Sequence, residues 1–291
     1  NRLSLKWYLG LSSALYESGK SWQIPIVINI INNKFSGKRK ILGLNIKFLN
    51  VDKNKKSYNA SNASLVAMDP KTGQILAMVG SRDFFNEEID GNVNVSVMDR
   101  QPGSSFKPFA YATAMKNENW GPGSTVYDLK TDFGGGYNPN NYDGSFKGPM
   151  SMRVALQGSR NIPAVKTLYI ASIKETLATA HAMGITTLND PSKYGLSLVL
   201  GAGEVKLLDM TGAYGVFANG GMKKDSTWFV KIEDSKKKTL EEYKDTPGKR
   251  VLDAQVAYLM SNVLSDDASR AYVFGAGGPL TLKGRPVAAK T

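Results

Sequence analysis

Cysteine is absent from this 291-residue chain, and histidine occurs only once, at His181. Without cysteine the chain can form no disulfide, no thiolate metal site and no thiol nucleophile. A Ser-His-Asp hydrolase is disfavoured as well, because that design needs a histidine as its base. The setting of His181, between two alanines and just before Met183-Gly184, indicates the end of an ordinary helix, so we expect it to be structural.

Long apolar runs are also missing. No stretch of about 18 or more apolar residues occurs, so this sequence contains no predicted membrane span. The chain starts at Asn1 without a signal-like segment and stops at Thr291 inside a motif, and we therefore interpret it as an excerpt of a longer protein.

Basic residues are in excess, with a formal net charge of +12, and 42% of the residues are hydrophobic. The length and the apolar fraction suffice for a full core. Positive charge suits an anionic environment such as nucleic acid, anionic lipid or wall polymer. Because the lysines are scattered and no nucleic-acid-binding module accompanies them, we expect no nucleic-acid partner and favour a solvated basic surface.

Residues 1–62 predict a small β-rich linker module. Ile24–Ile31 is rich in β-branched residues and predicts a strand, broken by Asn32-Asn33. The alternation over Ile41–Leu49 predicts a second strand, which we expect to pair with the first across a turn at Gly37–Lys40.

A β-hairpin is predicted directly after this module. Leu65–Met68 and Ile75–Val79 are short apolar segments, and Asp69–Gln74 between them has the Asp-Pro and Thr-Gly composition of a turn. Further on, Lys116–Asn141 is rich in glycine, proline and asparagine, which predicts a loop along a cleft rather than regular structure.

Ser104 and Lys107 are candidates for a serine nucleophile and its lysine base. Pro102-Gly103 predicts a turn into a helix, on which side chains three residues apart share a face, so the hydroxyl and the amine can meet. A buried lysine loses its proton more easily and can act as the base that activates a serine. Ser105 would point away. The alternative is an ordinary first helical turn with a solvated lysine.

Two further motifs accompany this Ser-x-x-Lys pair. Ser159 and Asn161 form Ser-x-Asn, and Lys290 and Thr291 form Lys-Thr at the end of the chain. Ser159 and Asn161 taken alone would equally suit a capped junction between two helices. The three motifs in this order are typical of penicillin-binding proteins and serine β-lactamases.

The residues around the motifs resemble the transpeptidase domain of class A penicillin-binding proteins, the bifunctional enzymes that build bacterial peptidoglycan. The similar segments are Ala63–Gly80, Arg100–Ala114, Tyr137–Val165, Leu200–Gly221 and Gly284–Thr291. The resemblance covers most of residues 63–291, which we interpret as a penicillin-binding transpeptidase domain truncated at its C-terminal end.

An α+β fold is implied by this resemblance. We expect an antiparallel β-sheet flanked by helices, begun by the Leu65–Val79 hairpin and completed by a strand ending in Lys290-Thr291. An all-helical lobe would hold Ser159, and the cleft would lie between the two lobes.

The resemblance implies acyl transfer through a serine ester. Unprotonated Lys107 would take the proton of Ser104 as its hydroxyl attacks the penultimate D-alanine of a stem peptide ending D-alanyl-D-alanine. Ser159 would relay a proton to the departing D-alanine. The amine of a neighbouring stem peptide would then attack the acyl-enzyme and form a cross-link, whereas a β-lactam would leave Ser104 acylated.

Substrate binding is implied for Asn161, Lys290 and Thr291. Asn161 would bond the substrate amide and help orient Lys107, and Lys290 with the Thr291 hydroxyl would hold the terminal carboxylate. No cofactor and no metal are implied. The implied partners are peptidoglycan stem peptides, β-lactam antibiotics and cell-wall synthesis proteins. The implied location is the extracytoplasmic face of a bacterial cell membrane, with the anchor outside this sequence.

Three departures from the family pattern carry expectations. The chain stops before the glycine expected after Thr291, so these residues are expected not to make a complete active site. Lys53–Asn62 is too short and polar for the amphipathic helix that usually precedes the hairpin. Nothing in the chain resembles the glycosyltransferase domain of a bifunctional enzyme.

Alternatives within the superfamily stay open. A D,D-carboxypeptidase would use the same residues with water as the acceptor. A class A β-lactamase needs a glutamate after Ser-x-Asn to activate water, and neither Glu175 nor Glu204 lies in a recognisable loop of that kind. A non-catalytic β-lactam sensor would bind penicillin without turnover, but such domains usually lack the Tyr137–Val165 and Leu200–Gly221 patterns.

Overall fold

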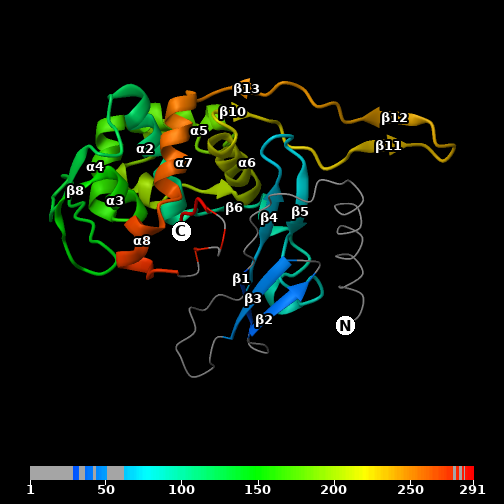
Figure 1. Ribbon diagram of the computed structural model, residues 1–291, viewed down its shortest axis with the longest axis horizontal. Helices are drawn as coiled ribbons and strands as arrows, with labels where there is room; N and C mark the ends of the chain where they lie inside the picture. The colour runs from blue at the N-terminus through cyan, green and yellow to red at the C-terminus, as the bar shows by residue number, and fades with distance from the viewer. Residues whose placement is uncertain are drawn as a thin grey trace.

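The computed structural model describes residues 62–277, 280–281, 284 and 286–291, together with the backbone of 29–32, 37–41 and 44–50. Most helices gather into one lobe, and a hairpin of two strands extends far out from it (Figure 1). Within the described residues, no helix combines the length and apolar character needed to cross a membrane.

The described elements are helices and short strands. The α-helices are α2 (Lys107–Asn117), α3 (Met152–Gln157), α4 (Asn161–Ala171), α5 (Ile173–Met183), α6 (Leu207–Ala218), α7 (Ala254–Leu264) and α8 (Asp267–Phe274). The 3-10 helices are η1 (Glu87–Ile89), η2 (Val95–Val97), η3 (Gly103–Phe106), η4 (Pro191–Lys193) and η5 (Leu196–Leu200). The strands are β1 (Asn29–Asn32), β2 (Gly37–Ile41), β3 (Leu44–Asn50), β4 (Leu65–Met68), β5 (Ile75–Val79), β6 (Asp99–Arg100), β7 (Thr125–Asp128), β8 (Gly148–Ser151), β9 (Val205–Lys206), β10 (Met222–Lys223), β11 (Lys231–Glu233), β12 (Thr239–Glu242) and β13 (Lys249–Arg250).

The predicted α+β class is confirmed, but after residue 62 the described strands pair only in twos. The antiparallel pairs are β4–β5, β6–β9, β7–β8, β10–β13 and β11–β12. The predicted β4–β5 hairpin is correct. The strand expected at Lys290-Thr291 is wrong for the described residues, because residues 286–291 meet no strand partner. Instead, the N–H of Ala289 donates to the carbonyl of Leu264 on α7 at 2.9 Å.

Near the N-terminus, β1 runs parallel to β3, and β2 pairs with β3 in antiparallel fashion. The turn predicted at Gly37–Lys40 is therefore wrong, because these residues belong to β2. In the order β1-β3-β2, strand β2 lies at the edge of this sheet. Most of the predicted Ile24–Ile31 strand lies outside the described residues, and the 1–62 module remains a prediction.

Helix α2 is the centre of the lobe. Its residues from Lys107 to Met115 are all buried, and it packs against α4, α5 and α7. A helix that is buried on all sides lacks a polar face, and the small and aromatic residues of α2 form no such face. Phe109 lies among the rings of Phe106, Tyr214 and Phe217, with centroids 5.1 to 6.2 Å away. Burial of this helix fixes the position of its first residue, Lys107.

The segment Lys116–Asn141, predicted as a loop, contains strand β7. Val126 and Asp128 alternate with exposed Thr125 and Tyr127, and β7 pairs with β8. The alternation was too short to stand out in a segment rich in glycine and asparagine. Strand β7 carries Asp128 into the interior, where its side chain is fully buried.

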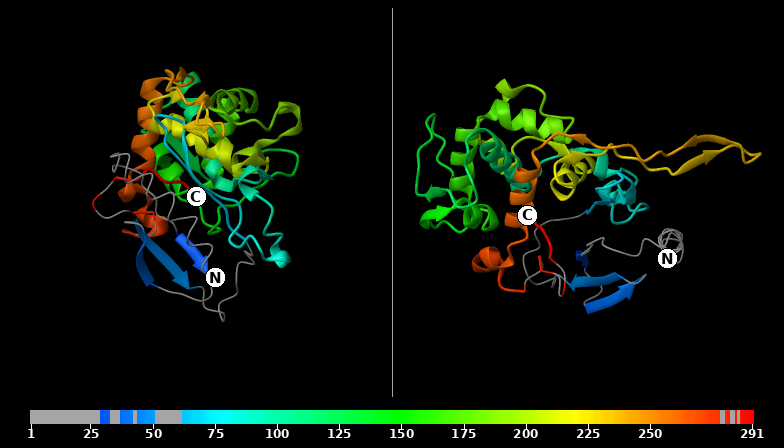
Figure 2. Two further views of the ribbon diagram at one scale, coloured as in Figure 1. Left: turned by 90° about the vertical axis from the view of Figure 1, so that its right-hand side faces the viewer. Right: turned by 45° about the horizontal axis from the view of Figure 1, so that its top comes forward.

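The β11–β12 arm projects away from the helical lobe, as the views in Figures 1 and 2 both show. All residues of both strands are exposed. The arm is attached through Thr227, whose N–H donates to the Gly73 carbonyl at 3.0 Å and whose carbonyl accepts from the N–H of Ile75 at 2.7 Å. The basic residues Lys236–Lys238 lie between the two strands, at the tip of the arm.

Candidate active site

Ser104 lies on the 3-10 turn η3, immediately before α2. The N–H of Lys107 donates to the carbonyl of Ser104, and residues three apart eclipse one another on such a turn. Within the described residues the Ser104 hydroxyl makes no hydrogen bond, whereas the Ser105 hydroxyl donates to the carbonyl of Pro102 at 2.6 Å. Ser104 is thus the serine whose oxygen is left for chemistry.

A close approach between two glycines supports this turn. Gly103 has a φ of +57°, and a Cβ added at Gly201 would lie 2.2 Å from its backbone nitrogen. Gly201 itself has a φ of +89°, which L side chains rarely adopt. The carbonyl of Ser105 accepts a hydrogen bond from the Tyr214 hydroxyl at 2.7 Å. The backbone on either side of Ser104 is therefore held by packing and by α6.

Lys107 is fully buried and points at the junction between α3 and α4. Its Nζ donates to the carbonyl of Ser159 at 2.6 Å and to Oδ1 of Asn161 at 2.8 Å. The hydroxyl oxygen of Ser159 lies 3.3 Å from the same nitrogen. The structure therefore brings together the lysine of one predicted motif and both polar residues of the next.

Burial, together with the positive charges of Lys290 and Arg160, lowers the pKa of Lys107 to about 6. No carboxylate makes an ion pair with it among the described residues, and both of its strong acceptors are uncharged. The amine is thus neutral at pH 7. A neutral amine has two N–H groups and one lone pair, and the two oxygen acceptors occupy both N–H groups.

The junction between α3 and α4 has an unusual backbone. Ser159 has a φ of +53°, in the left-handed region, and Asn161 starts α4, with Pro163 in its first turn. The hydroxyl of Ser151 caps α3 by accepting from the N–H of Val154. Non-glycine residues with positive φ persist only where the surroundings hold them. The contacts that hold Ser159 come from several distant segments.

Lys290 reaches the same junction from the end of the chain. Its Nζ donates to the Ser159 hydroxyl at 2.7 Å and to the Thr291 carbonyl at 2.6 Å. Burial lowers the pKa of Lys290 to about 7. The side chain of Thr291 is exposed and makes no hydrogen bond in the described part of the chain. Hydrogen bonds therefore connect Lys107, Ser159, Asn161 and Lys290. Among the described residues, none joins the hydroxyl of Ser104 or that of Thr291 to this group.

Arg160 was not predicted as a site residue, although it lies inside the Ser-x-Asn motif. Its guanidinium is fully buried and donates to Asp128 at 2.8 Å, to Asp143 at 2.8 Å and to the carbonyl of Ser145. Asp128 also accepts from the amide of Asn141 at 2.7 Å. An arginine within a motif is a signal that sequence reasoning could have followed, since arginine is almost never buried unpaired.

His181 has the structural role that was expected. It lies in the last turn of α5, and its Nε2 is 2.8 Å from the carbonyl of Thr187. Within the described residues, no group of three or more His, Asp or Glu side chains could hold a metal ion.

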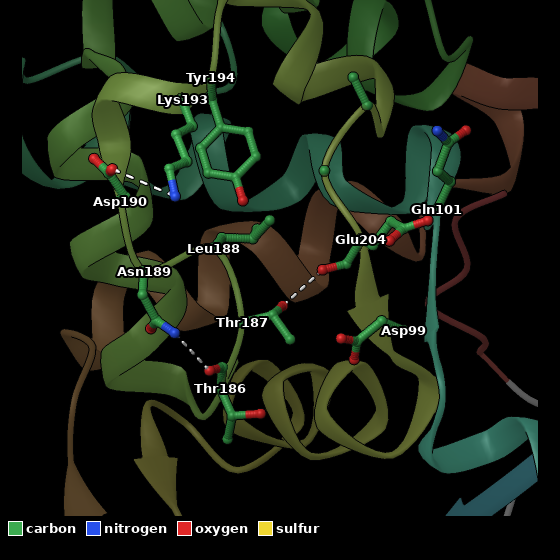
Figure 3. A pocket seen from close by; sticks show the side chains of 12 residues that line it. Asp99, Gln101, Thr186, Thr187, Leu188, Asn189, Asp190, Lys193, Tyr194 and Glu204 are labelled. Carbon is green, nitrogen blue, oxygen red and sulfur yellow. Dashed lines mark hydrogen bonds and ion pairs between the residues drawn. The ribbon is translucent and has the colours of Figure 1, made fainter.

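A pocket of about 640 Å³ lies elsewhere on the lobe, beside β6 and η4 (Figure 3). Asp99 and Gln101 face Glu204 and Thr187 across it, and the hydroxyl of Thr187 donates to the Glu204 carbonyl at 2.7 Å. None of the predicted site residues lines it. The pocket is mostly surrounded by exposed polar side chains, and the candidate chemistry does not depend on it.

Comparisons with known proteins agree on one family. The family model described as the penicillin binding protein transpeptidase domain matches residues 63–291. Penicillin-binding protein 1A of Rickettsia bellii (strain RML369-C) is 35% identical over 176 residues, which are 59% of this chain and 21% of that protein. Penicillin-binding protein 1F of Bacillus subtilis (strain 168) is 34% identical over 207 residues, which are 70% of this chain and 28% of that protein.

Solved structures show the same likeness. The crystal structure of penicillin-binding protein 1A from Haemophilus influenzae has a TM-score of 0.61 and 28% identity, and the match covers 70% of this chain and 35% of that chain. PonA1 from Mycobacterium tuberculosis in complex with penicillin V has a TM-score of 0.62 at 21% identity, covering 77% of this chain and 60% of that chain. The second likeness concerns the fold alone.

The chain belongs to the penicillin-binding protein transpeptidase family. Relatives named penicillin-binding protein 1A, together with the structural neighbour of that name, place it more narrowly as a transpeptidase domain of class A. The resemblance seen in the sequence is thereby confirmed.

Proposed function

We propose that this chain is the peptidoglycan D,D-transpeptidase part of a class A penicillin-binding protein. Ser104 attacks the carbonyl carbon of the penultimate D-alanine in a stem peptide, the bond to the terminal D-alanine breaks, and an acyl-enzyme forms. The amine of a second stem peptide then displaces Ser104 and forms the cross-link. β-Lactams acylate the same hydroxyl. This proposal is supported above all by the neutral, buried Lys107 amine three residues after a free serine hydroxyl.

The proton movements follow from the two lysines. Lys107 has the lower pKa, so its lone pair is the one available to accept the Ser104 proton. Lys290 keeps more of its positive charge at neutral pH and suits the terminal carboxylate of the substrate. The Ser159 hydroxyl, which accepts from Lys290, can pass its own proton to the departing D-alanine amine and recover one from Lys107.

Substrate contacts are assigned to Asn161, Lys290 and Thr291. The Oδ1 of Asn161 is already engaged with Lys107, and its Nδ2 donates to the carbonyl of Asn140 at 2.8 Å. A substrate carbonyl would therefore compete with Asn140 for that amide. The exposed Thr291 hydroxyl can join Lys290 on a carboxylate.

The test is intact-protein mass spectrometry of the full-length protein incubated with a penicillin and followed for hours. We expect a persistent adduct of one antibiotic mass, absent from Ser104→Ala and present in Ser105→Ala. No adduct on the folded wild-type protein would refute the assignment of Ser104.

The same adduct separates the alternatives. Rapid loss of the adduct with hydrolysed antibiotic would indicate a β-lactamase. A persistent adduct calls for a second assay, in which the protein is given a peptide ending D-alanyl-D-alanine and an amine acceptor. A new amide product indicates a transpeptidase, release of D-alanine without that product indicates a carboxypeptidase, and no turnover indicates a sensor.

A further inference from the structure

Arg160 lies between the two residues of the Ser-x-Asn motif, and its side chain leaves the motif in another direction. Ser159 and Asn161 face Lys107, whereas the Arg160 guanidinium is directed toward Asp128 on β7 and Asp143 on the loop before β8. The side chains of Arg160 and Asp128 are both fully buried. We call the group of Arg160, Asp128, Asp143, Asn141 and Ser145 the arginine clamp.

The arginine clamp holds Asn161 through Asn141. The Oδ1 of Asn141 accepts from the N–H of Asn161 at 2.8 Å. Its Nδ2 donates to Asp128 at 2.7 Å and to the carbonyl of Ser145 at 2.9 Å. One buried amide thus links the first N–H of α4, the interior carboxylate of β7 and the loop. A shift of the Asn161 backbone would break its bond to Asn141.

The arginine clamp also holds Ser159. The N–H of Arg160 donates to the carbonyl of Ala155 at 3.0 Å, and the N–H of Ser159 donates to the carbonyl of Leu156 at 3.1 Å. The side chain of Arg160 is then fixed in the opposite direction by two carboxylates. With both ends of Arg160 fixed, Ser159 must keep its positive φ, which aims its carbonyl and hydroxyl at Lys107.

Arginine fits this place better than lysine would. Its planar guanidinium donates from Nε to Asp128 and from its terminal nitrogens to Asp143 and the carbonyl of Ser145 at the same time. A lysine ammonium is a single point on a flexible chain and cannot span these acceptors in one plane. The hydrogen bonds from Arg160 and Ser145 hold the pKa of Asp143 well below its usual range. Its carboxylate therefore stays ionised at any pH above 5.

We propose that Arg160 is a positioning residue of the active site, which sets Ser159 and Asn161 around Lys107 through its ion pairs with Asp128 and Asp143. This inference rests on the proposed acylation of Ser104. Arg160, Asp128 and Asp143 do not touch the reacting atoms. They fix the positions of Ser159 and Asn161, which contact Lys107. An error of about 1 Å in such a position can cost on the order of 100-fold in rate.

The experiment measures the rate of penicillin acylation of the full-length protein between pH 5.5 and pH 9, with thermal unfolding in parallel. Arg160→Lys keeps the positive charge and loses the planar contacts. Asp143→Asn leaves the buried pair of Arg160 and Asp128 intact, so it is the milder variant. Arg153→Gln is the matched control, because Arg153 also contacts a carboxylate, Asp266 at 3.2 Å, and an asparagine on α7, but none of the motif residues.

We expect Arg160→Lys to slow acylation by about 100-fold and Asp143→Asn by about 10-fold, while Arg153→Gln stays within about twofold of the wild type. The midpoint of the pH profile of the acylation rate should be unchanged in Arg160→Lys. It should move to higher pH for Arg160→Met, because the charge of Arg160 is one cause of the low pKa of Lys107. That shift reports the charge of Arg160. The positioning role is tested by slow acylation in folded Arg160→Lys, which keeps both the charge and the midpoint.

Wild-type acylation rates in both Arg160→Lys and Asp143→Asn, with the proteins folded, would overturn the positioning role. Equal slowing in Arg153→Gln would overturn it too, because the effect would then be general. Absence of an adduct in the wild type would instead refute the proposed function. The two failures are therefore distinguishable.

Discussion

Ionisable side chains are buried in the cluster around Lys107 and exposed in the β11–β12 arm. In the cluster, Lys107, Arg160 and Asp128 are fully buried, and each has hydrogen-bond partners in fixed positions. In the arm, the ion pair of Lys231 and Glu233 is 2.5 Å long but both side chains are about two-fifths exposed, at 43% and 38%. Buried charges are expensive unless every partner is present, whereas exposed pairs contribute little. The hydrogen bonds of the cluster therefore fix the positions of its side chains, whereas the exposed ion pair of the arm does not need a fixed position.

The largest contrast should come from removing the buried amine. Lys107→Met should slow acylation by about 1,000-fold, because the serine then lacks its base. Lys231→Met on the arm should leave the rate unchanged.

In the wild type, acylation should rise with pH and level off above a midpoint near pH 6, where Lys107 loses its proton. Stopped-flow or quenched mass measurements with one penicillin check both points, and an unchanged rate in Lys107→Met would break the comparison.

Gly201→Ala tests how tightly the backbone under Ser104 is packed. The new methyl would lie 2.2 Å from the nitrogen of Gly103, and the position has a φ of +89°. We expect a loss of about 2–4 kcal/mol in the free energy of unfolding, from backbone strain and steric clash together. Gly220→Ala is the control of equal backbone type, since its φ is +60° but no atom lies within 4 Å of the added methyl. Denaturant unfolding of both variants separates clash from strain.

The pH dependence of stability should differ between the two regions. The pKa of Lys107 is about 6 in the fold and 10.5 without the fold, so between these values the unfolded state binds one proton more. Stability then rises with pH across that window, by at most about 1.4 kcal/mol per pH unit for this group. Lys107→Met should remove that contribution, and Lys231→Met should leave the slope as it is. Urea unfolding at pH 7, 8 and 9 gives the slopes, and equal slopes in all three proteins would contradict this account.

The smallest effect is expected within the arm. Glu233→Gln removes the partner of Lys231, and we expect a change of less than about 0.5 kcal/mol in the free energy of unfolding. Asp128→Asn removes a carboxylate from Arg160 in the interior and should cost on the order of 3 kcal/mol. Thermal unfolding of the two variants side by side measures the contrast. A large effect of Glu233→Gln would show that the arm has a structural role after all.

The sequence predicted the residues that meet, because their types and order are read directly from the chain. The motifs alone indicate Lys107, Ser159, Asn161 and Lys290, and two short apolar segments with a turn composition between them predict the hairpin of β4 and β5. Local patterns suffice where a motif or a short period carries the information.

What the sequence did not predict depends on contacts between distant segments. Asp128 lies in a segment that its glycines and asparagines identified as a loop, and only pairing with β8 makes it part of a strand. The ion pair of Arg160 and Asp128 joins residues 32 positions apart, which no local period reveals. The Lys290 segment was expected in a strand, but among the described residues it docks by hydrogen bonds to Ser159 and Leu264 instead.

The attachment of the arm has a mechanical consequence. Its base is fastened to the turn between β4 and β5 by Thr227 and by the Tyr243 hydroxyl, which donates to the Thr72 carbonyl at 2.7 Å. The arm is therefore held at its base, while its tip has no such attachment among the described residues. A pull at Lys236–Lys238 would load the hydrogen bonds that Thr227 makes with the backbone of Gly73 and Ile75. Force applied at the tip would thus divide between this turn and the β10–β13 pair, whose strands adjoin α6 and α7 in the chain.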